Sequence, residues 1–205
     1  MEILLRPSIH IPSSGTIETE TSFPKMSFFR APIQNVRPSE SIDLVELYQR
    51  IISDRYAAIT QQLRKLTEPR EQRSFKARRF DYVTISGNFT RRCEEGLKAH
   101  SGLLVVDLDH LEDLPYVKQL LLTDKELSTE LLFTSPSGNG LKWVVECDLK
   151  EWTHAQYFQA VASYLKQTYG LQADVSGRDV CRACFIPYDP QAVLGDIYRM
   201  EVRPP

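Results

Sequence analysis

The sequence predicts an α+β fold, in which mixed or antiparallel sheets pack against helices. Three observations favour it. Strand-like and helix-like segments alternate along the chain, the alternation lacks the strict regularity of repeated strand–helix–strand units, and 42% of the 205 residues are apolar. A chain of this length can form one sizeable core, or one domain with a small appendage. We expect an α+β domain over residues 39–205, preceded by an N-terminal arm or edge segment over residues 1–38.

The N-terminal arm is rich in loops, because five prolines are spread among its polar residues. Its strand candidates are short and cover Glu2–Leu5 and Met26–Ala31. Beyond the arm, apolar residues recur at helical spacing over residues 42–52. Asp43 lies in the first turn of this expected helix, where a negative charge suits the helix dipole.

The next stretch of the chain is expected to contain a helix break and then a strand. The helix breaks near residues 53–54 and resumes to about Leu66. The segment 64–79 follows with seven Arg or Lys and two Glu. After it, residues 80–86 are predicted to form a strand, with Gly87 and Asn88 as its turn.

Charge is distributed unevenly, although the net charge is only −2. The basic segment 64–79 contrasts with residues 103–135, which carry seven acids and two lysines. A global excess of positive charge, which would favour non-specific nucleic-acid binding, is absent. The local contrast is compatible with a phosphate track that leads to a metal-binding centre, and also with two solvated charged faces.

The centre of the chain has the clearest pattern. Residues 102–111 form a nearly continuous apolar run, which is typical of a strand buried on both faces. Pro115 can occupy the first turn of a helix that runs to about Leu122. Strands are then expected over residues 129–135 and 141–147, on either side of a Ser- and Gly-rich loop.

The C-terminal part is expected to contain one long helix and two strands. Thr153 and Gln156 have the spacing of a capping box at the start of the helix, and Gly170 stands where the helix should end. Residues 182–188 and 197–202 are candidates for the final strands.

Asp107 and Asp109 are the first candidates for chemistry. At positions i and i+2 of a strand, both carboxylates project from the same face. Two neighbouring carboxylates repel each other, and Mg²⁺ or Mn²⁺ with bound phosphates is the usual way to compensate that repulsion. The alternative interpretation is that they are ordinary strand-end acids that cap the following turn.

The loop after the 129–135 strand is the second candidate. A Ser- and Gly-rich turn exposes backbone N–H groups and hydroxyls, and glycine permits close approach of a phosphate. Lys142 follows as a point charge suited to a phosphoryl oxygen. The same pattern is also an excellent hairpin turn, and both interpretations can hold together. The candidate phosphate-binding residues are Ser135, Ser137, Gly138, Gly140 and Lys142.

The third candidate is the segment 173–179 together with Arg182. Asp174 is a possible further metal ligand, and Arg178 or Arg182 could clamp a triphosphate with two parallel hydrogen bonds. A simple Asx or Ser turn after the long helix is the alternative.

The cysteines and histidines carry no prediction of a site. Cys93, Cys147, Cys181 and Cys184 are too few and too scattered for a disulfide framework. Cys181 and Cys184 lack the second ligand pair that a zinc site needs, and Cys184 is expected to be buried on a strand. The four histidines form no ligand motif.

Taken in order, these segments resemble a known family. The stretches SGNFTRRCEEGLKAHSGLLVVDLDHL, SPSGNGLKWVVE and DVSGRDVCRACFIPYDP resemble the BT4734-like domain family, formerly called VirE N-terminal, over roughly residues 75–192. Members of that family commonly stand at the front of primase–helicase-type proteins of Bacteroidetes mobile elements and phages. The chain therefore looks like an excised N-terminal domain or a short stand-alone member.

The order of motifs is also similar, more distantly, to that of archaeo-eukaryotic-type primase-polymerases. That resemblance implies a primase-polymerase-like fold with an RRM-like core. It maps the first metal-binding motif to Asp107 and Asp109 and the second to Ser137 and Lys142. The third maps to Asp174, with Asp179 as the second choice. The polymerases have a histidine where this chain has Lys142, which keeps phosphate affinity but loses the imidazole.

The resemblance implies metal-dependent nucleotidyl transfer on a single-stranded DNA template. Mg²⁺ or Mn²⁺ would be held by Asp107, Asp109 and Asp174, and the motif-two residues with Arg182 would hold a nucleoside triphosphate. Phe80 or Phe89 could stack on an exposed base. The arginines expected to follow the template backbone are Arg78, Arg79, Arg91 and Arg92.

Two other function classes stay open. One is a module without catalytic activity that binds single-stranded DNA or a helicase partner. The other is a metal-dependent nuclease, since carboxylate pairs on strands also serve phosphodiester hydrolysis. The sequence contains no run of 18 apolar residues and no signal-peptide pattern, so we expect a cytoplasmic protein without membrane contact.

Overall fold

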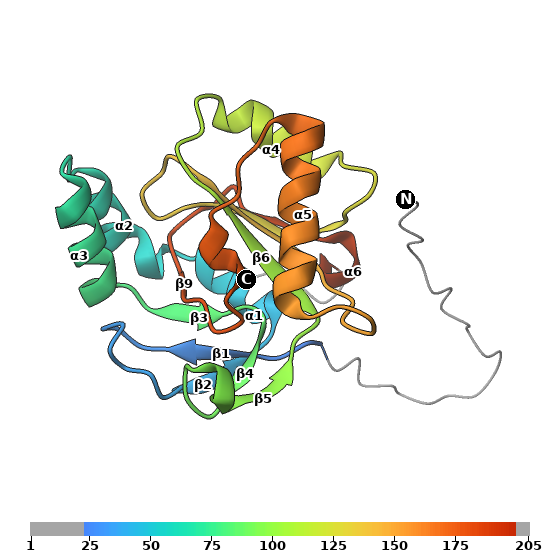
Figure 1. The fold of residues 1–205 in the computed structure, drawn as a ribbon. Coiled ribbons are helices and arrows are strands. Elements are labelled where there is room, and N and C mark those ends of the chain that lie inside the picture. The colour runs from blue at the N-terminus through green and yellow to red at the C-terminus, as the bar shows by residue number, and fades with distance from the viewer. Residues whose placement is uncertain (1–22, 200–205) are drawn as a thin grey trace.

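Antiparallel pairing builds the sheets of the computed structural model, which describes residues 23–199 (Figure 1). The first sheet has the strand order β2-β1-β3-β9. Its strands are β1 (Met26–Phe29), β2 (Glu40–Ile42), β3 (Tyr82–Thr84) and β9 (Cys184–Phe185). The strand predicted within the N-terminal arm is thus confirmed as β1, which lies between β2 and β3.

The second sheet contains the apolar strands of the centre of the chain. Its order is β10-β7-β8-β6, and a separate two-stranded sheet pairs β4 with β5. These strands are β4 (Gly87–Phe89), β5 (Leu97–His100), β6 (Leu103–Leu108), β7 (Thr129–Thr134), β8 (Leu141–Glu146) and β10 (Val193–Leu194). The three long predicted strands are therefore confirmed as β6, β7 and β8.

Both faces of the second sheet are covered, which explains the continuous apolar run in β6. Leu103 and Val105 belong to the core shared with the first sheet and α1 (Leu44–Ile52). Leu104 and Val106 belong to a second core, formed with α4 (Leu114–Leu122) and α5 (His154–Tyr169). Because side chains alternate along a strand, each face needs its own apolar set. The α+β class is thereby confirmed, with α4 and α5 on one face of the second sheet and the first sheet with α1 on the other.

The first helical region breaks where the sequence predicts. Asp43 and Glu46 form a capping box that starts α1, and the helix ends at Ser53. A short 3-10 turn η1 (Asp54–Tyr56) leads into α2 (Ala57–Arg64). The basic segment then forms α3 (Pro69–Arg79), a helix without buried residues. Figure 1 shows α2 and α3 together at one side of the sheets.

The two later helices begin at side-chain caps, and the caps predicted for α5 are confirmed. The Asp113 carboxylate accepts the N–H of Tyr116 at 2.9 Å at the start of α4. Thr153 and Gln156 form the capping box of α5, and Gly170 ends that helix with a φ of 70°, a value that glycine adopts without strain. Two further short 3-10 turns are η2 (Glu94–Gly96) and η3 (Val175–Arg178).

Two predicted elements are wrong. Gly87 and Asn88 lie in β4 and not in a turn, because they pair with His100 and Ala99 of β5. The pairing is close enough that a side chain at position 87 would meet Leu97 Cδ1 at 2.6 Å. The predicted strand 197–202 begins instead as the short helix α6 (Asp196–Arg199), where Tyr198 packs into the first core. The Glu2–Leu5 candidate lies outside the described residues.

Two further comparisons with the sequence concern strand β9 and membranes. β9 is shorter than the predicted strand 182–188, although Cys184 is buried on it as expected. Within residues 23–199, no helix has both the length and the apolar character needed to cross a bilayer.

Candidate active site

A buried ion pair lies between the first two motifs. The register of β6 and β8 places Asp107 directly opposite Lys142. Lys142 Nζ donates to Asp107 Oδ1, and the two side chains are only 10% and 4% exposed. Both residues point toward the first sheet, as their neighbour Val105 does. Strand register alone therefore brings motif one and motif two into contact.

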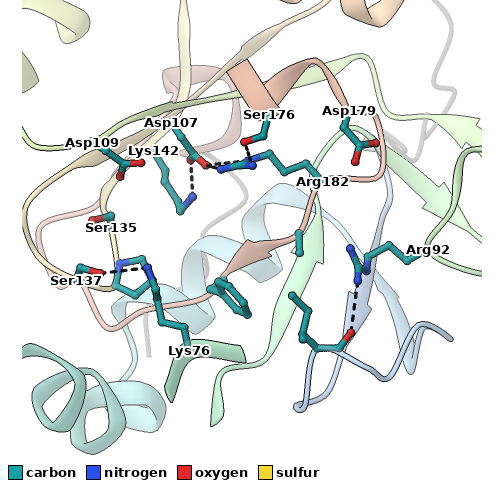
Figure 2. A pocket seen from close by; sticks show the side chains of 14 residues that line it. Lys76, Arg92, Asp107, Asp109, Ser135, Ser137, Lys142, Ser176, Asp179 and Arg182 are labelled. Atoms are coloured by element: carbon teal, nitrogen blue, oxygen red, sulfur yellow. Dashed lines mark hydrogen bonds and ion pairs between the residues drawn. The ribbon is translucent and has the colours of Figure 1, made fainter. Parts of the chain in front are cut away.

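Arg182 supplies a second cation to the same carboxylate. Its Nε and Nη2 donate to Asp107 Oδ2 at 2.9 and 2.6 Å, and Nη2 also reaches Asp174 Oδ2 at 2.8 Å. Arg182 Nη1 donates to Ser176 Oγ. Together these residues form what we call the Asp107 network: Asp107, Lys142, Asp174, Ser176 and Arg182 (Figure 2).

The charges in this network stabilise one another. Burial by itself would raise the pKa of Asp107, but the charges and hydrogen bonds of Lys142 and Arg182 outweigh it and hold that pKa below its ordinary value. Burial opposes the charge of Lys142 in the same way, and Asp107 outweighs it and raises the pKa of Lys142. Both groups are therefore ionised at neutral pH.

The third motif is attached to the outer edge of β6. The Asp174 N–H donates to the carbonyl of Asp107 at 2.9 Å, and β6 is the edge strand of the second sheet as far as the structure describes the chain. The Asp174 carboxylate accepts the N–H of Ser176 at 3.0 Å, which begins η3. This turn confirms that the Asx-type structure is present, and it holds Asp174 beside Arg182.

The turn of the second motif is a tight hairpin, and its glycines allow the backbone conformation and close contacts of that hairpin. The Ser135 N–H donates to the Gly140 carbonyl at 2.8 Å. A side chain at position 140 would lie 2.4 Å from the Leu108 carbonyl, and Gly138 has a φ of 85° beside Arg64. The hairpin interpretation is therefore confirmed, while the role of these glycines toward a phosphate stays a prediction.

Ser135 stands out in this turn because its hydroxyl is buried without a partner. The residue is 6% exposed, and its Oγ has no hydrogen-bond partner among the described residues. Buried hydroxyls are almost always hydrogen-bonded, since leaving one unpaired costs free energy. Ser135 is also one of the residues that line the cavity described below.

Helix α3 contributes a residue that the sequence analysis did not single out. Lys76 Nζ donates to Ser137 Oγ at 3.2 Å, on the far side of the cavity from Arg182. Burial and the charge of Lys142 lower the pKa of Lys76. Its position in the basic segment 64–79 was the only signal in the sequence, and the helix selects which of the seven cations faces the cavity.

Residues from all three motif segments line one cavity of about 350 Å³, although Asp174 itself is not among them. Figure 2 shows Asp107 and Asp109 on one side, Ser135 and Ser137 on another, and Arg182 on a third. Ser176, Asp179, Lys76 and Arg92 complete its polar wall, and Ile33 and Phe185 are among its apolar contacts. Segments from distant parts of the sequence, from Ile33 to Phe185, thus form a single site.

Comparison with protein families identifies the chain. The family model for the BT4734-like, N-terminal domain matches residues 75–194, which is more than half of the sequence. The chain belongs to the BT4734-like N-terminal domain family. The matched region runs from α3 to β10 and contains all three motifs. Neither the curated proteins nor the solved structures give a match.

The other predicted residues of this BT4734-like domain differ in their distance from the cavity. Arg92 lines it and donates to the Tyr82 hydroxyl at 3.2 Å. Arg78, Arg79 and Arg91 are exposed and are not among the residues that line the cavity. Their role in binding a template stays a prediction. Stacking of a base on Phe80 or Phe89 is wrong, because both rings are buried in the interior and no more than 1% exposed.

The three predicted metal ligands do not form a cluster in the described residues. Asp107 is closed in by Lys142 and Arg182, Asp109 is exposed at the end of β6, and Asp174 pairs with Arg182. Among residues 23–199, one other group of metal-ligating residues does converge. The ligand atoms of His100, Cys147 and His154 lie within 4.8 Å of one another. The aspartate metal site therefore stays a prediction that needs its own test.

Proposed function

We propose that this BT4734-like domain binds a nucleoside triphosphate in the cavity and transfers its nucleotide to a strand that grows on a single-stranded DNA template, as a primase-polymerase does. The observation that carries the proposal is the meeting of the three motifs around one cavity. Each motif suits one part of the reaction, and the fold brings them together from separate strands and turns.

The basic and hydroxyl groups of the cavity are suited to a triphosphate. Lys76 and Ser137 lie on one side of it and Arg182 on another, so successive phosphates could be contacted from both sides. The unpaired hydroxyl of Ser135, on the same side of the cavity as Ser137, could serve as a further donor. Hydrogen bonds from charged donors to phosphate are about twice as strong as neutral ones, which favours this ligand over a neutral one.

Asp107 and Asp109 are the residues that would hold a divalent cation. Carboxylate oxygens are the ligands that Mg²⁺ and Mn²⁺ prefer, and Asp109 is the exposed carboxylate of the pair. Such a cation would neutralise phosphate charge and stabilise the attacking and leaving oxygens. At Asp107 it would compete with Lys142 and Arg182, which would turn toward the phosphates. Asp174 fits better as the positioning partner of Arg182.

In the proposed reaction, a 3′-hydroxyl attacks the α-phosphorus of the bound nucleotide. A new phosphorus–oxygen bond forms, the bond to pyrophosphate breaks, and the hydroxyl proton leaves to a base or to water. Lys142 and Arg182 would balance negative charge on the phosphates during this step. Lys142 replaces a histidine in this role and remains charged across the neutral range.

The proposal is tested by incubating the domain with an unprimed single-stranded DNA template, Mg²⁺ or Mn²⁺, and labelled NTPs or dNTPs. We expect template-dependent products with the wild type and their loss in Asp109→Asn. Glu112→Gln is the matched control, because Glu112 is an exposed acid of the same loop that does not line the cavity. Products of equal yield from Asp109→Asn would contradict the proposal. Degradation of labelled DNA without nucleotide would instead indicate a nuclease.

A second function has one specific observation in its favour. Both oxygens of Asp107 are already paired with cations, which makes the carboxylate a structural anchor. A domain that binds single-stranded DNA or a helicase partner but has no catalytic activity would need Asp107 only as such an anchor. It predicts DNA binding that weakens with salt but is unchanged by EDTA and by Asp109→Asn.

A further inference from the structure

A second cluster of polar side chains lies at the opposite end of the β6–β8 strand pair from Asp107. His100 ends β5, Cys147 directly follows β8, and His154 is the first residue of α5. One ligand atom from each lies within 4.8 Å of the other two. Cys147 and His154 are buried, and His100 is half-buried. The candidate nucleotide site uses none of them.

The spacing of the two imidazoles fits a tetrahedral metal centre. His100 Nε2 lies 3.1 Å from His154 Nδ1. Two nitrogens bound to one Zn²⁺ at their usual bond lengths, with a tetrahedral angle between them, are about 3.3 Å apart. The two rings therefore need only a small movement to share one ion. Two imidazoles and one thiolate are also a donor set that Zn²⁺ prefers.

The hydrogen bonds around the cluster hold His154 in the tautomer that this role needs and His100 in the other one. His154 Nε2 lies 3.2 Å from the Gly177 carbonyl, so Nε2 carries the proton and Nδ1 presents its lone pair to the cluster. An outer hydrogen bond of this kind fixes the tautomer of a metal-binding histidine. His100 Nδ1 accepts the N–H of Gly102 at 3.0 Å, which places the other proton on Nε2, between the two rings.

We propose that His100, Cys147 and His154 bind a zinc ion, with water in the fourth position. His100 would coordinate through Nε2 and move its ring proton to Nδ1, giving up the hydrogen bond from Gly102. Cys147 would coordinate as a thiolate, so one proton is released to solvent for each ion bound. No electron transfer is involved, and the proposal is independent of the proposed nucleotidyl transfer.

An ion in this position would fasten together segments that carry the candidate site. It would join the ends of β5 and β8 to the first turn of α5. Through the bond from His154 to Gly177 it would also hold η3, whose Ser176 contacts Arg182. Its expected role is structural, since it would stiffen the wall that carries Asp174.

Cobalt absorption distinguishes this cluster from any oxygen-rich site. The full chain is freed of metal by chelation and titrated with Co²⁺ and then with Zn²⁺. We expect one equivalent of Co²⁺ with thiolate-to-cobalt charge-transfer absorption in the near ultraviolet and visible bands typical of tetrahedral cobalt, both removed by Zn²⁺. Cobalt bound at Asp107 and Asp109 would show no thiolate band.

Two variants locate the ion. In Cys147→Ser the thiolate band should disappear, and the affinity for Zn²⁺ should fall by at least about tenfold. Cys181→Ser is the control, because Cys181 is outside the cluster and contacts Asp179 instead. If Cys147→Ser does not fold, His100→Gln changes a half-buried ligand instead, and the affinity for Zn²⁺ should again fall by at least about tenfold. A thiolate band that persists in Cys147→Ser, or the absence of such a band in the wild type, would overturn the proposal.

Discussion

The two ends of the β6–β8 strand pair satisfy their buried polar groups in different ways. At one end, Asp107 is held between Lys142 and Arg182 as a network of full charges. At the other, the side chains of His100 and His154 are joined by hydrogen bonds between neutral groups. At the charged end the carboxylate is paired with two cations, whereas at the neutral end the ring nitrogens are held only by hydrogen bonds, some of which a bound cation would displace. The comparison shows how one sheet can carry two sites with different chemistry.

The largest expected effect comes from breaking the charged end. Asp107→Asn leaves Lys142 and Arg182 without their central partner in a buried setting, and should lower the free energy of unfolding by about 3–5 kcal/mol. Urea denaturation monitored by circular dichroism measures this change in the free energy of unfolding. Asp109→Asn is the control, because Asp109 is exposed and its loss should change stability by no more than about 0.5 kcal/mol. Equal effects of the two variants would show that the network adds nothing to stability.

The charged end should also dominate the response to acid. The pKa of Asp107 is lower in the folded protein than in the unfolded chain, where it is about 3.9. The network therefore stabilises the fold above about pH 4, and this contribution is lost as the pH falls through the folded pKa. Urea denaturation between pH 7 and pH 2.5 should show the gap between wild type and Asp107→Asn narrowing in acid. A gap that stays constant would contradict this origin.

The neutral end should respond less strongly when no metal is present. His154→Leu removes the donor to the Gly177 carbonyl and the acceptor for His100, and should cost about 1–3 kcal/mol. Since no full charge is lost, the cost should not depend on salt between low and moderate ionic strength. Urea denaturation of the metal-free protein at two salt concentrations tests both statements. A cost that changes with salt would indicate a charged histidine pair.

The smallest stability effect is expected at the rim of the candidate site. Lys76 is bonded to Ser137, and burial and Lys142 already disfavour its charge. Lys76→Met should change the free energy of unfolding by less than about 0.5 kcal/mol. Its effect should appear in triphosphate affinity, which falls severalfold at low salt and less at high salt. Titration with a labelled nucleotide at two salt concentrations measures this. Unchanged affinity would remove α3 from the proposed site.

Local rules were sufficient for most of the fold. Apolar runs identified β6, β7 and β8, and a capping box identified the start of α5. Asp43 was expected in the first turn of α1 and is instead its N-cap. The turn predicted at Gly87 and Asn88 was wrong because these residues form strand β4 through their pairing with β5, a contact that no local pattern indicates. Helix α3 could not be predicted from hydrophobic periodicity, because it has no buried residues and its sequence is polar on all sides.

The two sites differ in how far the sequence could predict them. Asp107, Lys142 and Asp174 stand in ordered motifs, so their meeting at one place could be expected from the family resemblance. The pairing of Asp107 with Arg182 depends on side-chain packing and was not foreseen. His100, Cys147 and His154 belong to no motif, and only the fold brings them together. Local patterns carry no information on such a contact.

The most direct test of the central claim is the affinity of Ser135→Ala for a nucleoside triphosphate. The buried Ser135 hydroxyl has no partner among the described residues, so its removal should leave stability unchanged or higher. If the cavity holds a triphosphate, losing this donor to a charged group should weaken binding by about 10- to 100-fold. Titration of wild type and variant with Mg²⁺ present gives the answer. Wild-type affinity in a stably folded Ser135→Ala would contradict the account.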